Sequence, residues 1–452
     1  MTEPIILGIS SLIVLVFLIV LRIPIAYAMI LTGGLGIVSI NGVETIFNQF
    51  KTLAYGQFSI YDLSVVPLFI LMGALASRIG LSSSIFAAAN SWLSWLRGGS
   101  AMAAISACAG FGAICGSSIA TASTMGRVAL PELRKSNYSA SLATGVLAAG
   151  GVLGILIPPS IVLIIYAIIV EVNIVSMFAA ALLPALLAIG LFLLTIAVFV
   201  TVYPHAAPQT YKTSKEERIR ATIGVLPAAS VFIVVLGGLY AGLFNPTPAA
   251  SLGVCLVLLI GYINQKLNLK EMKEAFLETA SMSGMIYLIL LGAELMKIYM
   301  SRIGLPQAIA DWILAAGFEP MTVLIALLIG MILLGCLLDS LSIILLIVPF
   351  FWPVLVELNG GVNVSSEMAG FGMTTNDLKI WFGILALVVV EVGLITPPVG
   401  MNVFVISSLA DDCDIADTFK GVTPFFFAEI IRIFVLISLP FLALWLPNIS
   451  SG

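Results

Sequence analysis

Apolar segments long enough to cross a lipid bilayer recur along almost the whole chain. A transmembrane helix needs about 20 mainly apolar residues. Stretches of that kind cover 4–22, 25–41, 139–157, 160–202, 221–243, 247–263, 275–300, 377–410 and 423–446. The stretch at 160–202 is long enough for two spans, and the one at 377–410 is interrupted. Because lipid offers no water to backbone polar groups, apolar runs of this length favour helices. The sequence therefore predicts an all-α polytopic protein whose main surroundings are the lipid bilayer.

Composition and missing motifs narrow the classes of function. Hydrophobic residues make up 61% of the chain and charged residues only 9%, whereas a soluble domain carries roughly 25% charged residues. The single histidine, His205, argues against a histidine metal cluster or a Ser/His/Asp catalytic set. The sequence has no GxxxxGK[ST] phosphate loop and no basic run with interleaved aromatic residues. We therefore expect neither an enzyme nor a partner of nucleic acid.

Three short motifs recur in the same order in the two halves of the chain. They are SRIGL at 77–81 and 301–305, a glycine–serine pair at Gly112/Ser117 and Gly335/Ser340, and a glycine followed by Pro-Pro at Gly154/158–159 and Gly393/397–398. Two-fold internal repeats are characteristic of secondary transporters. We therefore expect a first repeat in residues 1–220 and a second in residues 221–452, each with its own scaffold helices.

The distribution of charge indicates that the two repeats are inverted. Cytoplasmic loops are enriched in Lys and Arg. The segment 100–132 is flanked by Arg97, Arg134 and Lys135, whereas the segment 320–356 is flanked by acidic residues only, among them Glu319 and Glu357. The two segments are therefore expected to enter the membrane from opposite sides. No Lys or Arg precedes the first span and Arg22 follows it, which predicts a periplasmic N-terminus.

The segment 100–132 is too long for one comfortable span and too short for two. It is rich in Gly, Ala, Ser and Thr, and both its ends are expected on one side. These features predict a re-entrant helical hairpin with its tip near 116–118, and the segment 320–356 is expected to form the matching hairpin. Irregular backbone at membrane depth is tolerated only where it is buried in protein or lines a cavity. The alternative is a small-residue face against which another helix packs.

Each half also contains a Pro-Pro pair within a long apolar segment. Proline removes a backbone donor and clashes with the preceding turn, so neither pair can sit in a continuous helix. We expect broken helices near 154–160 and 393–402. Discontinuous helices at corresponding positions of two repeats indicate the transport site. The alternative is that each pair simply ends a span in an ordinary loop.

Each hairpin tip and its broken helix are expected to form a cation site. Carbonyls, hydroxyls and at most one carboxylate are hard oxygen ligands that suit Na⁺, and two such sites predict at least two coupled ions. The residues expected at the first site are Ser117, Ser118, Gly154, Ile157 and Pro159. Those expected at the second are Asp339, Ser340, Gly393, Thr396, Pro398 and Asn402. Half-helix N-termini nearby would face an anionic substrate, which is expected to meet Thr121, Ser123, Thr124, Ser160 and Asn402.

Several charged residues inside apolar segments have two possible interpretations. Asp339 is a functional candidate as an intramembrane carboxylate, and it also suits the N-cap of a helix at the second tip. Glu391 either tunes a site or pairs with a neighbouring helix. Arg127 can meet a substrate carboxylate or extend to the membrane interface, and the second reading is favoured. Glu294 and Lys297 are spaced to pair with each other on a helix.

Several motifs resemble the large membrane subunit of tripartite ATP-independent periplasmic (TRAP) transporters. They are PLFILMG at 67–73, GSSIATASTMGRVALPELRK at 116–135, GILIPPS at 154–160, Pro246-Thr247, Gly335 with Asp339, and ITPPVGMN at 395–402. The resemblance covers nearly the whole chain. It implies a bacterial inner-membrane symporter coupled to Na⁺, with an ion-transporter-like elevator fold. It also implies two partners: a small four-helix (Q-type) membrane subunit and a periplasmic (P-type) substrate-binding protein that delivers an organic acid such as a carboxylate or sulfonate.

Other functions remain as alternatives. A stand-alone Na⁺/dicarboxylate symporter without a binding protein has the same arrangement of inverted hairpins. A channel does not require two mutually inverted hairpins. An intramembrane enzyme needs paired acids, a Ser/His set or a metal cluster at membrane depth, which the sequence does not offer.

Overall fold

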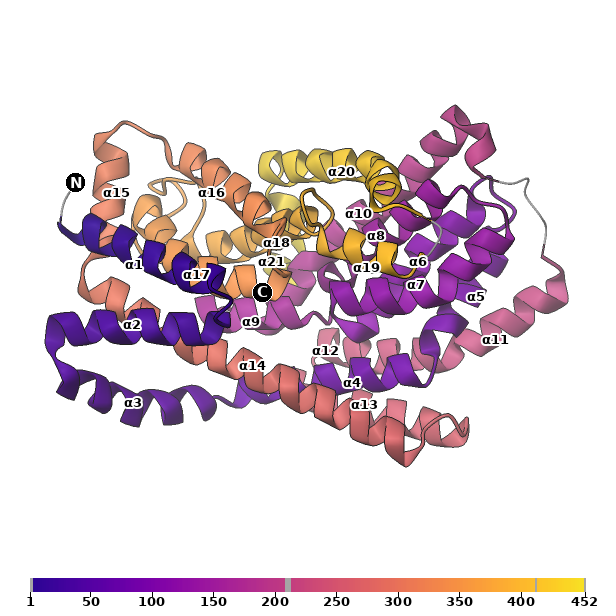
Figure 1. The fold of residues 1–452 in the computed structure, drawn as a ribbon, viewed down its shortest axis with the longest axis horizontal. Helices are drawn as coiled ribbons and strands as arrows, with labels where there is room; N and C mark the ends of the chain where they lie inside the picture. Colours follow the sequence, from indigo (N-terminus) through magenta and orange to yellow (C-terminus); the bar gives the residue numbers. More distant parts are fainter. Residues whose placement is uncertain (1–2, 208–212, 411–412, 451–452) are drawn as a thin grey trace.

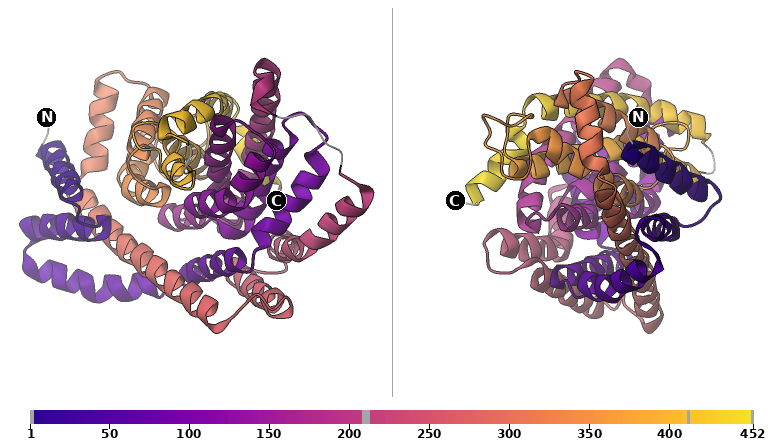
Figure 2. Two further views of the ribbon diagram at one scale, coloured as in Figure 1. Left: turned by 45° about the vertical axis from the view of Figure 1, so that its right-hand side comes forward. Right: turned by 90° about the vertical axis from the view of Figure 1, so that its left-hand side faces the viewer.

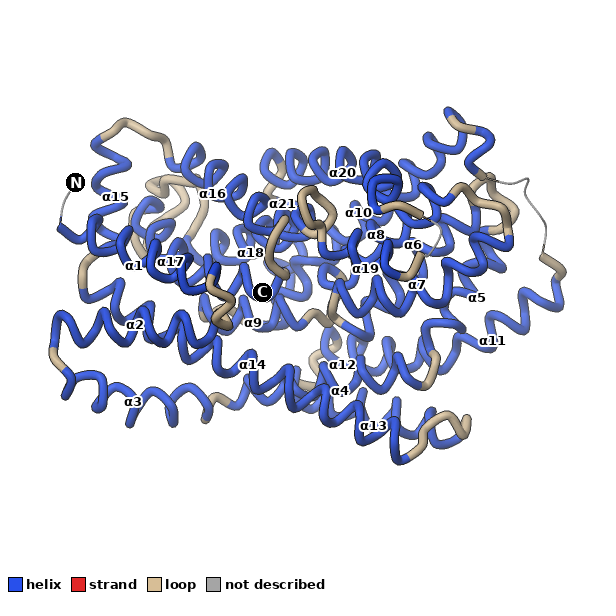
Figure 3. The backbone as a smooth tube through the Cα atoms, in the orientation of Figure 1, coloured by secondary structure: helices blue, strands red, loops and turns tan. Residues whose placement is uncertain are grey.

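The computed structural model describes residues 3–207, 213–410 and 413–450, and every regular element in these ranges is helical (Figure 3). Seven of the described helices are long and apolar enough to cross a membrane, or up to nine spans if two bent helix pairs each count as one. The expected all-α membrane fold is therefore confirmed.

The described part of the N-terminal half contains ten α-helices, which are labelled in Figure 1. They are α1 (Glu3–Val20), α2 (Ile25–Asn41), α3 (Val43–Phe58), α4 (Val65–Arg78), α5 (Leu81–Leu93), α6 (Gly99–Cys115), α7 (Ser118–Lys135), α8 (Ala140–Leu156), α9 (Ile161–Val170) and α10 (Ile174–Val202). The turn η1 (Tyr61–Ser64) joins α3 to α4, and η2 (Pro204–Ala206) follows α10.

The C-terminal half repeats much of this order. Its helices are α11 (Lys215–Phe232), α12 (Gly238–Tyr240), α13 (Pro246–Ile263), α14 (Leu269–Arg302), α15 (Leu305–Ala315), α16 (Pro320–Gly335), α17 (Ser340–Asn359), α18 (Thr375–Gly393), α19 (Met401–Ser408), α20 (Ile415–Ser438) and α21 (Phe441–Ser450). A π-helical turn, η3 (Ile233–Gly237), continues α11 into α12.

The long helix α14 crosses the molecule below the central bundle. Its 34 residues correspond to about 51 Å at 1.5 Å per residue, which is longer than the hydrocarbon core of a bilayer. Figures 1 and 2 show α14 running obliquely, with α1–α3 beside its C-terminal end and α4 and α13 beside its N-terminal part. The hairpins and broken helices gather above it. This arrangement separates an outer frame, α1–α4 with α11–α14, from the central bundle, α6–α10 with α16–α21.

The repeated SRIGL motif forms the same turn in both halves. Gly80 lies between α4 and α5 with φ 75°, and Gly304 lies between α14 and α15 with φ 66°. The glycine N–H donates to Ser77 at 3.2 Å in one turn and to Ser301 at 3.1 Å in the other. Glycine adopts this left-handed backbone conformation without a Cβ clash. The repeat in the sequence is therefore a repeat in the chain path.

Both expected hairpins are present. The first consists of α6 and α7, which meet at the first tip, residues 116–118, because Gly116 has φ 65° and Ser117 caps α7. The second consists of α16 and α17, which meet at the second tip, residues 336–340, where Asp339 caps α17. Ser and Asp are favoured N-caps because their side-chain oxygens accept the free N–H groups of the first turn. Local chemistry thus ends and restarts a helix at each tip.

Both expected breaks are present as well. The helix α8 ends at Leu156 and α9 begins at Ile161, with their axes bent by 41°. The helix α18 ends at Gly393 and α19 begins at Met401. The peptide bonds Pro158–Pro159 and Pro397–Pro398 are both cis.

Some elements differ from the expected spans. The helices α3, α5 and α15 fall outside every expected span, because they mix polar and apolar residues or are short. The expected span 423–446 is instead divided between α20, which begins at Ile415, and α21. The division lies next to Pro440, which cannot continue a helix hydrogen-bond ladder.

Candidate functional site

The first tip lies directly against the first helix break. A Cβ atom placed on Gly112 would lie 2.6 Å from the Cα of Gly154, and one placed on Gly116 would lie 2.8 Å from the carbonyl oxygen of Pro159. Such distances leave no room for a side chain, so glycine permits the contact between α6 and α8. Ile157 is extended (φ −82°, ψ 122°), and its neighbours from 151 to 160 are all buried.

The second tip repeats this contact with the second break. A Cβ atom placed on Gly335 would lie 2.9 Å from the Cα of Gly393. The N–H of Gly400 donates to the carbonyl of Cys336 at 3.4 Å. The glycines aligned from the sequence, Gly112 with Gly335 and Gly154 with Gly393, therefore meet in equivalent pairs. Each half brings one hairpin tip and one interrupted helix together.

Serine and threonine side chains project from the start of α7. Ser117 accepts from the N–H of Ala120 at 3.4 Å and is half-buried. Thr121 is fully buried, and its Oγ1 has no hydrogen-bond partner among the described residues. A Cβ atom on Gly154 would lie 2.4 Å from this Oγ1 and 2.7 Å from the carbonyl oxygen of Ser117. A hydroxyl and a carbonyl oxygen thus face the first break, and such oxygens can bind a hard cation.

Asn402 joins the second break to the first tip. Its backbone N–H donates to Leu394 at 3.0 Å, within the second break. Its side chain, however, donates from Nδ2 to Ser118 Oγ at 2.7 Å and to the Ala148 carbonyl at 3.3 Å. The Oδ1 atom is buried and has no partner among the described residues. The sequence analysis grouped Asn402 with Asp339. The hydrogen bonds of its side chain are instead with the first half, because the short helix α19 packs on α7 and α8.

The second tip makes mainly local hydrogen bonds. The carboxylate of Asp339 accepts from both the N–H, at 3.2 Å, and the hydroxyl of Ser342. It therefore acts as the N-cap of α17, which is one of its two expected readings. Thr396 Oγ1 donates back to the Val392 carbonyl at 2.6 Å. Ser340 is buried, whereas Asp339 is half-buried and Pro398 is exposed, so the second tip is more open than the first.

A cavity of about 410 Å³ lies between the first hairpin and the outer frame. Ser117, Ser123 and Thr124 line it from α7. Of the other residues expected to meet substrate, Thr121, Ser160 and Asn402 are fully buried and do not line this cavity. Ser160 instead caps α9 by accepting from the N–H of Leu163 at 3.3 Å. The structure thus places Ser123 and Thr124 at the cavity and buries the other three expected substrate residues away from it.

The frame side of this cavity carries Arg78 and several carboxylates. Arg78 makes ion pairs with Glu271 at 3.1 Å, Glu274 at 2.8 Å and Glu278 at 3.0 Å. Ser77 contacts Thr124 across the cavity, with 3.1 Å between their hydroxyl oxygens. The cavity is therefore bordered by the hydroxyl-bearing face of α7 and by an acidic wall on α14.

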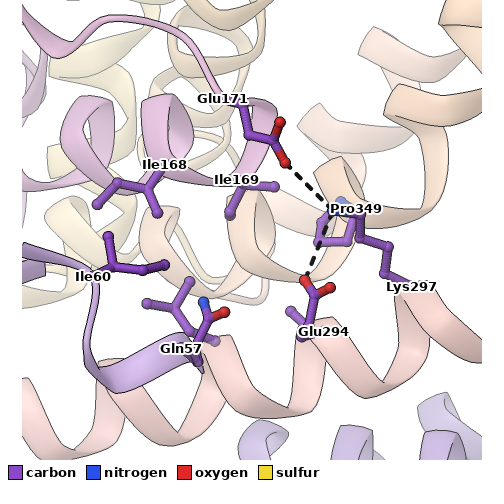
Figure 4. A pocket seen from close by; sticks show the side chains of 10 residues that line it. Gln57, Ile60, Ile168, Ile169, Glu171, Glu294, Lys297 and Pro349 are labelled. Carbon is purple, nitrogen blue, oxygen red and sulfur yellow. Dashed lines mark ion pairs between the residues drawn. The ribbon is translucent and has the colours of Figure 1, made fainter. Parts of the chain in front are cut away.

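A second cavity, of about 310 Å³, lies at the far end of α14 (Figure 4). Lys297 on α14 lies 3.8 Å from Glu294 on the same helix, as the sequence spacing predicts, and 3.9 Å from Glu171 at the end of α9. Figure 4 shows both carboxylates directed toward Lys297. The frame and the central bundle are thus linked by an ion pair at this end.

Sequence reasoning missed a buried charge triad. Glu391 pairs with Arg432 of α20 at 2.8 Å, and Arg432 also pairs with Glu429; all three side chains are fully buried. Glu391 therefore pairs with a neighbouring helix, one of its two expected readings. The missed signal was present, because Glu429 and Arg432 are ionisable residues inside an apolar span.

A family model described as "Tripartite ATP-independent periplasmic transporter, DctM component" matches residues 12–442. The chain is 30% identical over 389 residues to the C4-dicarboxylate TRAP transporter large permease protein DctM of Pseudomonas aeruginosa, covering 86% of each. It is 27% identical over 397 residues to the sialic acid TRAP transporter large permease protein SiaM of Vibrio cholerae, covering 87% of each. These relatives are transport permeases.

Among solved structures, the YdaH transporter of Alcanivorax borkumensis has a similar fold. The TM-score is 0.63, and the match covers 91% of both chains at 15% sequence identity. At this identity the likeness concerns the fold alone.

Proposed function

This chain belongs to the DctM component family of tripartite ATP-independent periplasmic transporters, and from that premise we propose that it is the large permease subunit of a Na⁺-coupled importer of an organic acid. The proposed coupling to Na⁺, in place of ATP hydrolysis, rests on the two hairpin tips. The paired contacts of Gly112 with Gly154 and Gly335 with Gly393 carry it, because they bring oxygen-rich backbone to equivalent places in both halves.

The atoms around the first tip fit a hard cation. Among the described residues, Thr121 Oγ1 and Asn402 Oδ1 are buried oxygens without a hydrogen-bond partner, and a buried polar atom left unsatisfied costs about 1–3 kcal/mol. A cation bound at the first tip beside Thr121 Oγ1 and the Ser117 carbonyl, which both face Gly154, would remove that cost for the threonine hydroxyl. For the first site we keep Ser117, Ser118, Gly154, Ile157 and Pro159, and for the second Asp339, Ser340, Gly393, Thr396, Pro398 and Asn402. We expect the two sites together to bind at least two Na⁺ ions.

An elevator mechanism is consistent with the division into frame and bundle. We propose that the central bundle moves against the frame of α1–α4 and α11–α14, carrying both tips. The first repeat, residues 1–220, and the second, residues 221–452, would each contribute helices to both parts. From the inverted distribution of Lys and Arg we infer that the Arg78 end of the cavity faces the cytoplasm and that the N-terminus lies in the periplasm.

The partners follow from the tripartite family. We propose a small Q-type subunit of four helices and a P-type binding protein in the periplasm, with the permease in the bacterial inner membrane. The relatives' names point to organic acids, because they include C4-dicarboxylate and sialic acid. The cavity beside α7 is where such an acid would lie, near Ser123 and Thr124.

The test is uptake of a labelled organic acid into proteoliposomes that contain this chain and its small subunit. An imposed Na⁺ gradient should drive uptake only when the binding protein is present. Uptake that requires Na⁺ but not the binding protein would replace the proposal with the stand-alone symporter. Uptake that is insensitive to Na⁺, with Li⁺ or K⁺ as the matched control, would overturn the cation sites.

A further inference from the structure

We propose that Arg127 binds the one negative group of the substrate and that the acidic wall opposite it excludes a second one, so that the transported acid is a monoanion with hydrogen-bond donors at its other end. This inference rests on the proposed function and narrows its substrate class. It also assigns to Arg127 a role other than extension to the membrane interface.

Arg127 belongs to a continuous face of α7 that borders the cavity. The residues of α7 and its cap that line the cavity are Ser117, Ala120, Ser123, Thr124 and Arg127. Their spacing of three and four residues places them on one side of a helix. Arg127 lies ten positions after Ser117, which corresponds to about 15 Å along the helix axis. The face therefore runs from the tip to a guanidinium at the end of the cavity away from the tip.

The guanidinium of Arg127 is free to bind a ligand. Arg127 is exposed, and across the described ranges of the chain it forms no hydrogen bond or ion pair. The other arginine of the cavity, Arg78, is surrounded by Glu271, Glu274 and Glu278. Arginine presents a planar fork that matches a carboxylate or sulfonate. Arg127 is thus the cationic side chain of this cavity that is available to an anion.

The opposite wall carries excess negative charge. Three carboxylates surround one guanidinium there, and two of them, Glu271 and Glu278, border the cavity itself. A carboxylate of the substrate placed on this wall would meet like charges without a free cation. Rejection by an unpaired or repulsive contact is a common source of specificity. A hydroxyl or ammonium group, in contrast, can donate to these carboxylates.

Hydroxyl groups between the two walls favour a polar substrate. Ser77 and Thr124 face each other at 3.1 Å from the two sides, and Ser123 lies on the same lining. Each hydroxyl can both donate and accept. A hydroxy acid can therefore exchange hydrogen bonds with them while its carboxylate pairs with Arg127.

The test uses matched pairs of acids that differ in the number of carboxylates. Gluconate and glucarate share their carbon chain and hydroxyls, and glycerate and tartrate form a shorter pair. Binding would be followed by isothermal titration calorimetry on the full chain, purified in detergent with its small subunit, in NaCl and in KCl. We expect gluconate or glycerate to bind at least tenfold more tightly than its diacid partner in NaCl.

Variants separate the two walls. Arg127→Gln should weaken binding of the monoacid by at least about tenfold, and Arg127→Lys should recover part of it. Glu278→Gln should raise the affinity for the diacid at least about fivefold relative to the monoacid. Lys135→Gln is the matched control, because Lys135 is exposed on the same helix, pairs with Glu132 at 2.6 Å and does not line the cavity.

Three results would overturn the inference while leaving the proposed function intact, and the first two concern binding of the acids. They are Na⁺-dependent binding of diacids at least as tight as that of monoacids, and Na⁺-dependent binding that Arg127→Gln leaves unchanged. Na⁺-dependent thermal stabilisation without binding of any of the four acids would also overturn it. If the wild-type complex shows neither Na⁺-dependent thermal stabilisation nor binding of any of the acids, the proposed function is overturned, and the inference with it.

Discussion

Asn402 Nδ2 donates a hydrogen bond to Ser118 Oγ at 2.7 Å, which connects the broken helix of the second half to the hairpin tip of the first. Both side chains are buried. Because the backbone N–H of Asn402 is bonded to Leu394 in the second break, this one residue couples a displacement of the first tip to a displacement of the second break. This contact offers a physical route by which occupancy of one proposed ion site affects the other.

We predict that Asn402→Ala raises the Na⁺ concentration needed for half-maximal uptake by roughly tenfold, since a lost hydrogen bond of this kind is worth about 1 kcal/mol or more. Ser118→Ala should have a similar effect. The double variant should be little worse than either single one, because residues in direct contact are not additive. Ser408→Ala, on the same helix with an exposed hydroxyl, should leave the Na⁺ dependence unchanged. Full additivity would argue against the coupling.

The glycine contacts between tips and breaks predict a sharp difference between two substitutions on α16. Gly335→Ala places a methyl group 2.9 Å from the Cα of Gly393, so helices must separate; overpacking of this kind costs typically 1–3 kcal/mol. Gly330→Ala meets nothing within 4 Å and should be neutral or slightly stabilising. Thermal unfolding in detergent and Na⁺-driven uptake would measure both. Equal stability and uptake for the two variants would contradict the close packing.

The buried triad predicts a large loss of stability when its central cation is removed. Arg432→Met leaves Glu391 and Glu429 buried without a counter-charge, and breaking a buried pair in this way costs about 3–5 kcal/mol. The triple variant Glu391→Gln, Glu429→Gln, Arg432→Met should recover most of the lost stability, because it leaves no buried charge. Unfolding by denaturant in micelles would measure it. As a control, Lys420→Met removes an exposed pair on the same helix, and no measurable change is expected; a similar loss there would count against the triad.

Local chemistry made much of this fold predictable. SRIGL predicts an internal repeat, and the structure has Gly80 and Gly304 in the same left-handed conformation, which glycine adopts without a Cβ clash. The tips were predictable because Ser117 and Asp339 are good N-caps placed after runs of helix. Pro-Pro pairs cannot remain in a helix, so the breaks followed as well.

The remaining features depend on contacts between distant parts of the chain. No period in the sequence relates Asn402 to Ser118, or Glu391 to Arg432, since each pair is set by how separate helices pack. Which arginine of the cavity is paired with carboxylates was also not predictable from the sequence. Arg78 is neutralised because α14 presents three glutamates to it, and Arg127 is left free because no described carboxylate reaches it.

The ion pair between Lys297 and Glu171 leads to a test of the proposed movement. Glu171 belongs to the central bundle and Lys297 to the frame (Figure 4). If the bundle moves against the frame in each cycle, this contact must break and form again. Cysteines at 171 and 297, in a background without the five native cysteines, should react with a short bifunctional thiol reagent and arrest Na⁺-driven uptake. Cleavage of a reducible linker should restore uptake.

A second cross-link within the frame provides the control for this prediction. Ser64 and Thr247 lie far apart in the sequence, and their hydroxyl oxygens are 3.2 Å apart between η1 and α13. A link between cysteines at these positions joins two parts of the same proposed rigid body, so uptake should continue. Arrest by both links would show only that the reagent is harmful. Continued uptake when every 171–297 pair is cross-linked would contradict movement of the bundle at this end. A short covalent tether does not permit the bundle to move across the membrane relative to the frame.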